Sequence, residues 1–252
     1  GIGPGDEVIT PPNSFVSSTA AIALLGATPV FADVLGDQNI DPAGIEAAIT
    51  PRTKAIMPVH LTGRLAAMGR IMEIAGNHGL AVIEDAAQAI GSTIDGKKGG
   101  VFGDVGCFSA HPLKNLNAAG DAGFAVTDDA GLAERLRRLR NNGLADRGTV
   151  AEWGRVARMD SLQAAILTHR LGKLDEVIAG RRANAALYHA QLDPKHVFSA
   201  PERENEFNTY HTFVVQADRR DGLVAHLANR GIGTAVHYPV PLHLQPAAKD
   251  LG

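Results

Sequence analysis

The chain is organised around residues 103–116, which read GDVGCFSAHPLKNL. The apolar run from Val105 to Phe108 predicts a short strand, and it leads into a loop that carries Lys114 ahead of the glycine-rich residues 117–123. A strand that runs into a loop of small residues often presents a reactive group at a sheet edge. A lysine in this setting can form a Schiff base with a carbonyl group when its surroundings lower its pKa. A lone loop lysine is more commonly a solvated charge, so the rest of the chain must supply the partners.

Composition narrows the class of protein. The 252 residues carry a formal net charge of −3 and are 45% hydrophobic, which suits one large domain with a smaller one. The balanced charge and the lack of a long apolar run predict no nucleic acid and no membrane partner. The single cysteine, Cys107, excludes an internal disulfide and indicates a reducing compartment, so we expect a cytoplasmic protein. Because Cys107 lies in an apolar strand, we interpret it as a small core residue rather than a nucleophile. We predict no metal site.

Short apolar segments alternate with helical ones through the first half of the chain. Asp41 followed by Pro42 is typical of a helix start, and Gly79 is typical of a helix end. Continuously apolar strands between helices favour an α/β fold, with a mainly parallel sheet sandwiched by helices. The expected strands are 8–10, 28–31, 54–59, 80–83, 105–108 and 124–127, and the expected helices are 14–25, 42–49 and 68–78.

The second half predicts helices, an exposed loop at 143–154 and then a smaller C-terminal α/β domain. Asp160 and Gln163 are spaced like a capping box. We place the large domain at 1–180 and the small one at 181–252, and expect that both are cut short at the chain ends. The expected helices are 132–141, 160–178, 181–192 and 221–230, and the expected strands of the small domain are 211–216 and 232–237.

Asp85 follows the apolar strand residues Ala81-Val82-Ile83 and therefore lies at the carboxyl edge of the sheet. Open α/β sheets bind their ligands at this edge. A carboxylate so close to the core costs several kcal/mol unless it has a partner, which is either a ligand or an internal hydrogen bond such as a helix cap. Gln88 lies near the same edge, where the alternative is an ordinary surface amide.

Asp85 and Lys114 each follow a strand of the same sheet, as a pyridoxal phosphate site requires. The lysine would hold the aldehyde, and the carboxylate would keep the pyridine nitrogen protonated so that the ring accepts electrons. Ser109, on the turn before Lys114, could bind a phosphate oxygen. Phe15 could stack on the ring, although an ordinary core aromatic is the simpler interpretation.

A series of motifs, in order over nearly the whole chain, resembles the DegT/DnrJ/StrS family of pyridoxal-phosphate-dependent sugar aminotransferases, which have fold type I. No single motif is specific, but their joint occurrence is. The motifs are PGDEVI at 4–9, GATPVF at 26–31, DP at 41–42, PRTKAI at 51–56, PVH at 58–60, EDAAQA at 84–89, KNL at 114–116, RMD at 158–160, QAA at 163–165, GIGT at 231–234 and HYPVP at 237–241.

The resemblance implies a role for each of five residues. Lys114 matches the Schiff-base lysine and proton shuttle, and Asp85 matches the partner of the pyridine nitrogen. Gln88 matches the amide beside the ring oxygen, Ser109 a phosphate ligand, and Phe15 the aromatic stacked on the ring. Relatives with histidine in place of the lysine are dehydratases, and Lys114 argues against that branch.

The resemblance also implies a ping-pong reaction. Glutamate or glutamine gives its amino group to pyridoxal 5'-phosphate, and a ketosugar, usually nucleotide-linked, or a ketocyclitol then receives it. The family builds its sites across a homodimer. His237 and Tyr238 resemble a segment near the substrate, and His60 and His111 are further candidates for contact with the substrate or the cofactor. For His111, a hydrogen-bonded loop histidine is the alternative.

Two departures from the family pattern affect the expected function. The glycine-serine/threonine loop that binds phosphate in the family would lie upstream of Gly1. Val156 stands where we expect an asparagine that reaches the phosphate of the neighbouring subunit, and valine cannot donate a hydrogen bond. These departures leave a second hypothesis open: a non-catalytic homologue that binds a sugar nucleotide or acts as a regulatory protein.

Overall fold

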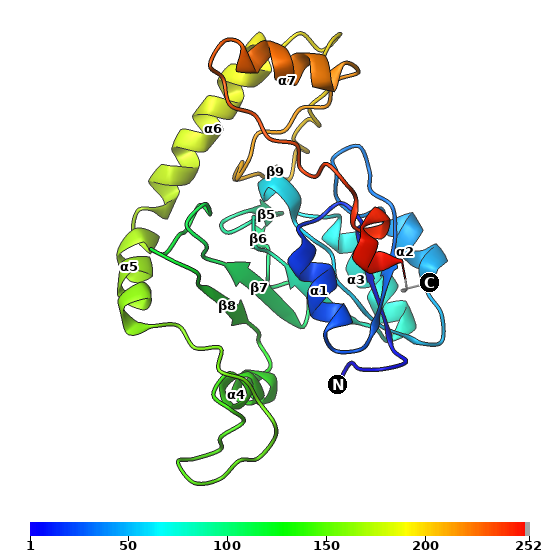
Figure 1. The fold of residues 1–252 in the computed structure, drawn as a ribbon, viewed down its shortest axis with the longest axis vertical. Coiled ribbons are helices and arrows are strands. Elements are labelled where there is room, and N and C mark those ends of the chain that lie inside the picture. Colours follow the sequence, from blue (N-terminus) through cyan, green and yellow to red (C-terminus); the bar gives the residue numbers. More distant parts are fainter. Residues whose placement is uncertain (250–252) are drawn as a thin grey trace.

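A six-stranded sheet forms the centre of the molecule (Figure 1), a computed structural model that describes residues 1–249. Neighbouring strands are parallel throughout, except that the last strand of the sheet runs antiparallel to its neighbour. In spatial order, the strands are β2 (Thr28–Phe31), β1 (Glu7–Thr10), β3 (Thr53–Ile56), β4 (Ala81–Asp85), β7 (Val105–Ser109) and β8 (Gly123–Val126). The predicted α/β fold with a mainly parallel sheet is confirmed.

Helices and a small second sheet complete the described chain. The small sheet is antiparallel and has the order β6 (Lys97–Lys98), β5 (Thr93–Ile94), β9 (Glu206–Phe207). The α-helices are α1 (Val16–Ala23), α2 (Pro42–Ala48), α3 (Met68–His78), α4 (Ala130–Leu139), α5 (Ser161–Leu171), α6 (Leu174–Gln191) and α7 (Arg220–Ala228). The short 3-10 helices are η1 (Leu61–Gly63), η2 (Leu242–Leu244) and η3 (Pro246–Ala248).

The core lies on both faces of the sheet because successive side chains of a strand point to opposite sides. Ile9 belongs to a buried cluster with residues of α2 and α3, including Ile71. Its neighbour Val8 belongs to a different cluster, which contains Ile22 of α1. The strands β1 and β3 are therefore covered by α1 on one face and by α2 and α3 on the other.

The helix ends follow the local sequence. Asp41 caps α2, with its Oδ1 accepting a hydrogen bond of 2.9 Å from the backbone N–H of Ala43. Gly79 ends α3 in the left-handed conformation, with a φ of 63° that glycine adopts without a steric penalty. The predicted helix at 68–78 is confirmed to the residue. Helix α5 differs, because the Asp160 side chain makes no cap bond and Gln163 Oε1 instead accepts the N–H of Ala119. The predicted capping box is wrong.

Four further predictions are wrong. The helix expected at 160–178 is divided between α5 and α6 by a break at Gly172 and Lys173. The strands expected at 211–216 and 232–237 do not form. The first of these segments pairs only at Gln216, in a bridge with Phe198. Cys107 is exposed rather than part of the core. The small domain was expected to extend to residue 252, and residues 250–252 lie outside the described part of the chain.

Helix α6 runs away from the large sheet, and the chain comes back to pair β9 with β5 before it reaches α7 (Figure 1). The chain then returns, and η2 and η3 lie beside the N-terminal part of the chain, where Leu242 N–H donates to the carbonyl of Pro12 at 2.9 Å. Residues from the C-terminal part are therefore brought back to the sheet edge that carries Asp85.

Candidate active site

The site forms at the carboxyl ends of two neighbouring parallel strands. Asp85 is the last residue of β4 and Ser109 is the last residue of β7, and the two strands pair in parallel. The loop after β7 carries Lys114 back towards Asp85, close enough for the carboxylate to influence the lysine. The structure thus brings Lys114 and Asp85 to the same sheet edge.

Asp85 is fixed by hydrogen bonds to its side chain and its backbone. The hydroxyl of Ser18, on α1, donates to Oδ2 at 2.6 Å, and the backbone N–H of Ala87 donates to Oδ1 at 3.0 Å. The Asp85 N–H donates to the carbonyl of Pro58, and the Asp85 carbonyl accepts the N–H of His60, both at 2.9 Å. The carboxylate is therefore held in one orientation, with room for a further donor because each oxygen accepts more than one hydrogen bond.

Lys114 lies half-buried on a tight turn in which its N–H donates to the carbonyl of His111 at 2.8 Å. Burial lowers the pKa of its amine, and the Asp85 carboxylate opposes this shift in part. Leu116, which follows in the loop, packs in a buried cluster with Leu167 and Ile178 of α5 and α6. The amine is therefore presented from an anchored loop, and its environment favours the neutral form more than water does.

Gln88 is held between two partners. Its Oε1 accepts the N–H of Thr62 at 2.7 Å, and its Nε2 donates to the hydroxyl of Tyr238 at 3.3 Å. Thr62 has a φ of 62°, an unusual value for a β-branched residue, and this conformation directs its N–H to Gln88. Burial raises the pKa of Tyr238, and the Asp85 carboxylate adds to this shift against the lowering effect of Gln88. The phenol therefore stays protonated at neutral pH.

The aromatic and hydroxyl candidates lie around the same edge. Phe15 is the N-cap residue of α1 and is 58% exposed, and its ring centroid lies 6.3 Å from that of Tyr238. Ser109 Oγ accepts the N–H of His111 at 3.3 Å. His111 itself is exposed, and its Nδ1 accepts the N–H of Leu113. Phe15 is thus a surface aromatic with a ring that is free to stack, rather than a core residue.

His60 requires a correction. It has no exposed surface, its Nε2 lies 2.8 Å from Oε2 of Glu84, and its Nδ1 accepts the N–H of Ala66. Since both ring nitrogens are engaged by buried groups, His60 holds the strand beneath Asp85 and has no face for a substrate. The expectation of substrate contact failed because the residue after a strand can turn inward as well as outward.

Glu84 receives hydrogen bonds from four donors at zero exposure. The backbone N–H groups of Phe102 and Gly103 donate to Oε1 at 2.6 and 2.7 Å, and Gly100 N–H and His60 donate to Oε2 at 2.8 Å each. Burial acts to raise the pKa of Glu84, but the hydrogen bonds from His60, Gly103 and Gly100 prevail and the pKa lies below its ordinary value. Glu84 therefore stays ionised and ties β4 to the loop before β7.

Sequence reasoning missed His211. Its Nδ1 lies 3.4 Å from Oδ1 of Asn115, the neighbour of Lys114, and Arg181 donates to its carbonyl at 2.7 Å. Burial lowers the pKa of His211 to about 3, and the positive charges of Lys114, Arg181 and His237 add to this effect. The imidazole is therefore neutral and lies near both Lys114 and His237. The sequence carries no signal for this, because the apolar pattern of residues 211–216 predicts a strand rather than a loop at the site.

The segment 208–212 joins the Gln88 side of the site to the Lys114 side. Thr209 N–H donates to the carbonyl of Gly63, and its own carbonyl accepts Nδ2 of Asn115 at 3.3 Å. Gly63 has a φ of 99°, and a Cβ on it would lie 2.8 Å from the backbone nitrogen of His211. Glycine is therefore required for this close approach of the two backbones.

Comparison with protein families accounts for this arrangement. The DegT/DnrJ/EryC1/StrS aminotransferase family model matches residues 1–252. The chain belongs to this family. The family assignment and the enzyme class expected from the motifs are confirmed, because members of this family are named sugar transaminases.

Relatives of similar identity are named as a regulatory protein and as a transaminase. A Geobacillus stearothermophilus protein named pleiotropic regulatory protein is 44% identical over 256 residues, which span 100% of this chain and 69% of the relative. The dTDP-3-amino-3,4,6-trideoxy-alpha-D-glucose transaminase of Streptomyces venezuelae is 45% identical over 249 residues, which span 98% of this chain and 66% of the relative. The chain thus spans about two thirds of the length of these relatives.

Solved structures of aminotransferases share the fold. S. venezuelae DesV superposes with a TM-score of 0.92 at 44% identity, covering 98% of this chain and 67% of DesV. Spr1654 from Streptococcus pneumoniae, solved in a PLP form, gives a TM-score of 0.92 at 26% identity and covers 100% of this chain and 71% of Spr1654. Aminotransferases of this family depend on pyridoxal phosphate, which agrees with the residue types gathered around Lys114 and Asp85.

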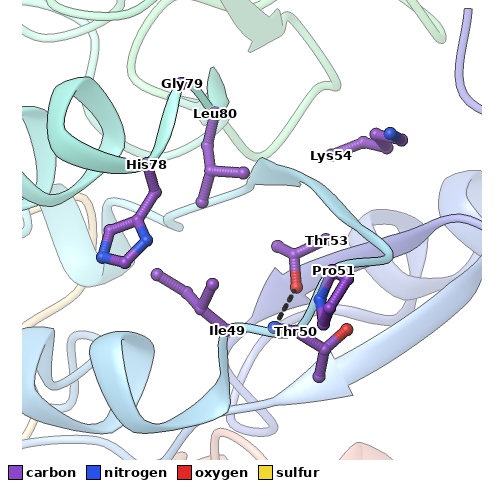
Figure 2. A pocket seen from close by; sticks show the side chains of 8 residues that line it. All are labelled: Ile49, Thr50, Pro51, Thr53, Lys54, His78, Gly79 and Leu80. Carbon is purple, nitrogen blue, oxygen red and sulfur yellow. Dashed lines mark hydrogen bonds between the residues drawn. The ribbon is translucent and has the colours of Figure 1, made fainter.

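Figure 2 shows a hollow of about 490 Å³ near the amino ends of strands β3 and β4. It is lined by Ile49, Thr50, Pro51, Thr53, Lys54, His78, Gly79 and Leu80. Thr53 and Leu80 stand at the amino ends of β3 and β4, whereas Asp85 ends β4. Thr50 N–H is already satisfied by Thr53 Oγ1 at 2.9 Å. The hollow is therefore separate from the site built around Lys114.

Other features of the described residues bear on the remaining predictions. Val156 is 65% exposed and Trp153 is 93% exposed.

Cys107 lies on β7 beside the site. Desolvation by surrounding atoms raises the pKa of its thiol to about 11, and the negative charges of Asp85 and Glu84 add to this shift. Within residues 1–249, no three His, Cys, Asp or Glu side chains are grouped to hold a metal ion. In the same range, no helix combines the length and the apolar character that crossing a bilayer requires.

Proposed function

We propose that this protein transfers an amino group from glutamate or glutamine to a nucleotide-linked ketosugar, in two half-reactions of a ping-pong mechanism with pyridoxal 5'-phosphate. The observation that carries the proposal is the presence at one sheet edge of Lys114, whose pKa is lowered by burial, and of the Asp85 carboxylate, which is held in one orientation. The family membership supports the same reaction type.

The side chains around this edge fit the cofactor. They offer an amine, a carboxylate, a hydroxyl, an amide and an exposed aromatic ring, from Lys114, Asp85, Ser109, Gln88 and Phe15 respectively. When bound, pyridoxal phosphate supplies an aldehyde carbon that carries the amino group and a ring that accepts electrons. We assign Ser109 to the phosphate, Gln88 to the ring oxygen and Phe15 to the ring face.

Lys114 performs two tasks in this proposal. Its lowered pKa leaves more of Nζ as the free amine at neutral pH, and the free amine is the form that attacks a carbonyl carbon. Once released, the same atom can take a proton from one carbon and return it to another, which is most efficient when its pKa lies near the working pH. The buried side chain of Leu116 anchors the loop from which Lys114 performs both tasks.

Asp85 holds a positive charge at the ring nitrogen. Its carboxylate is kept in one orientation by Ser18 and Ala87, so that little reorganisation is needed as charge develops in the ring. A neutral amide at this position could not stabilise a protonated nitrogen by charge. Asp85→Asn is therefore expected to lose most of the activity while the protein remains folded.

The acceptor class rests on the names of relatives and on residues near Asp85. Relatives are named for transamination of dTDP- and UDP-linked sugars. Tyr238 contributes a protonated hydroxyl close to Gln88 and Asp85, and the exposed His237 adjoins it. We assign both residues to the sugar side of the site, with Tyr238 as a donor to a sugar hydroxyl or carbonyl. His111, exposed on the Lys114 turn, is a further candidate.

The test uses the purified protein with pyridoxal phosphate, glutamate and a dTDP- or UDP-linked 3-ketosugar. We expect an aminosugar and 2-oxoglutarate in equal amounts, with parallel lines in double-reciprocal plots. Lys114→Ala should abolish both products, and Lys98→Ala, at an exposed position, should be indistinguishable from wild type. A folded Lys114→Ala variant that retains full turnover would refute the proposal.

The family pattern also leads us to propose a homodimer. Leu113, on the turn that carries Lys114, is 75% exposed, and Trp153 and Val156 are exposed as well. Large exposed apolar side chains are typical of surfaces that a second subunit covers. Light scattering of the protein at micromolar concentration should give twice the chain mass, and a fully active monomer would contradict this.

A regulatory protein remains the second candidate, because one relative is named pleiotropic regulatory protein. Val156, which cannot donate a hydrogen bond to a neighbouring phosphate, points the same way. Lys114 and Asp85 favour the enzyme. A protein that binds a dTDP- or UDP-sugar but leaves glutamate unchanged in the presence of pyridoxal phosphate would favour the regulator.

A further inference from the structure

Ser18 is a polar residue on the buried side of α1. The buried residues of this helix are Ser18, Thr19 and Ile22, and Ile22 belongs to the apolar cluster over β1 and β3. A buried hydroxyl costs free energy unless it is hydrogen-bonded. The Ser18 hydroxyl lies 2.6 Å from Asp85 Oδ2 and 3.5 Å from the carbonyl oxygen of Phe15. Since a hydroxyl has one hydrogen, the shorter contact, to Asp85, takes it.

The partner of this hydroxyl is a carboxylate, so the bond is of the charge-assisted kind and stronger than a neutral one. The Asp85 carboxylate accepts one other hydrogen bond: the backbone N–H of Ala87, two residues along the chain, donates to its Oδ1. Ser18 is thus the contact that ties the carboxylate to a different element. Loss of it would leave Asp85 free to rotate about the axis that the Ala87 bond defines.

Helix α1 also carries the aromatic candidate. Phe15 is the N-cap residue, one turn before Ser18, and residues at this spacing lie on neighbouring parts of a helix surface. The helix therefore fixes the distance between an exposed ring and the group that orients the carboxylate. Ser17, between them, is exposed.

We propose that Ser18 is a positioning residue for the reaction, and that its hydroxyl keeps the Asp85 carboxylate aimed at the ring nitrogen of pyridoxal phosphate. The inference rests on the proposed function. It assigns to α1 the alignment of the ring-stacking side chain with the carboxylate, so that one helix sets both contacts to the cofactor ring.

The test compares Ser18→Ala, Ser18→Thr and the matched control Ser17→Ala in the holoenzyme. Alanine has a higher helix propensity than serine, so the Ser18→Ala helix should form as well as that of wild type. We expect Ser18→Ala to lower kcat about tenfold, in line with the loss of a hydrogen bond to a charged group, and to weaken binding of pyridoxal phosphate several-fold in an absorbance titration of the apoenzyme. Tm and the KM for glutamate should stay at wild-type values.

Two further results decide the mechanism. Ser18→Thr keeps the hydroxyl and should retain kcat within about threefold of wild type. In the Asp85→Asn background, Ser18→Ala should change cofactor affinity by less than about twofold, because the charge through which Ser18 acts is gone.

The proposal is overturned if Ser18→Ala matches Ser17→Ala in kcat and cofactor affinity. It is also overturned if Ser18→Ala lowers Tm together with activity and Ser18→Thr restores neither, since that pattern indicates a packing role. If Asp85→Asn keeps wild-type activity, the assignment of Asp85 in the proposed function fails. If Asp85→Asn is inactive while Ser18→Ala keeps the kcat and the cofactor affinity of wild type, only the positioning role of Ser18 is refuted.

Discussion

Replacing Glu84 by glutamine should destabilise the protein more than the same replacement of a surface glutamate does. Oε1 of Glu84 accepts two backbone N–H groups, and Oε2 accepts Gly100 N–H and Nε2–H of His60. Glutamine keeps one acceptor oxygen, and its amide group would turn N–H bonds towards two donors. His60 cannot respond by moving its proton to Nδ1, because Nδ1 accepts the N–H of Ala66.

The magnitude follows from two buried donors left without an acceptor. Each costs about 1–3 kcal/mol, which makes the loss about 2–6 kcal/mol out of a total stability on the order of 5–15 kcal/mol. In urea unfolding followed by circular dichroism, the midpoint should fall by roughly 1 M or more. The control is Glu46→Gln, on the surface, where the ion pair with Arg70 is about half exposed and contributes little.

The same variant has a predicted pH dependence. The folded pKa of Glu84 is lowered below 4.5, so its contribution is fully present above the unfolded pKa and is lost as the pH falls through the folded pKa. The difference between wild type and Glu84→Gln should therefore shrink on acidification below about pH 4.5. Equal urea midpoints at neutral pH would refute the role of Glu84, and a difference that grows in acid would refute the assigned charge state.

Other predictions concern His211 and Tyr238. The folded pKa of His211 is about 3 against 6.5 unfolded, so on acidification the unfolded state takes up a proton first and stability falls from pH 6.5 towards 3. His211→Phe should therefore lose less unfolding free energy than wild type between about pH 7 and about pH 5 in urea titrations, and an identical loss would contradict this. Tyr238→Phe removes the acceptor of Gln88 and a donor to the sugar, so kcat/KM for the ketosugar should fall about fivefold or more, with the urea midpoint unchanged.

The sequence predicts the local features of this fold well, because they depend on neighbouring residues. Gly79 ends α3 and Asp41 caps α2, as the helix-end signals indicate. The apolar strand before Asp85 and the one before Lys114 pair as neighbours in the sheet, since short apolar strands between helices form a parallel sheet whose carboxyl ends share an edge. The meeting of Lys114 and Asp85 could therefore be anticipated from the order of elements.

Contacts between distant segments could not be anticipated in the same way. Residues 211–216 have the composition of a strand, but a strand needs a partner along its length, and this segment pairs only at Gln216, with Phe198. His60 comes after β3 and Asp85 ends β4, so both are candidates for the site. His60 nevertheless turns into the core, because Glu84 offers it an acceptor there. Ser18 resembles any other small residue of α1 until the structure brings it to Asp85.

The measurement that tests the central claim most directly is an absorbance spectrum of the purified protein with added pyridoxal phosphate, recorded before and after glutamate. Covalent attachment at Lys114 predicts a new band in the near-ultraviolet to visible region, which glutamate shifts and which Lys114→Ala abolishes. The absence of a band, or a band that glutamate leaves unchanged, would contradict the proposed first half-reaction and favour the regulatory candidate.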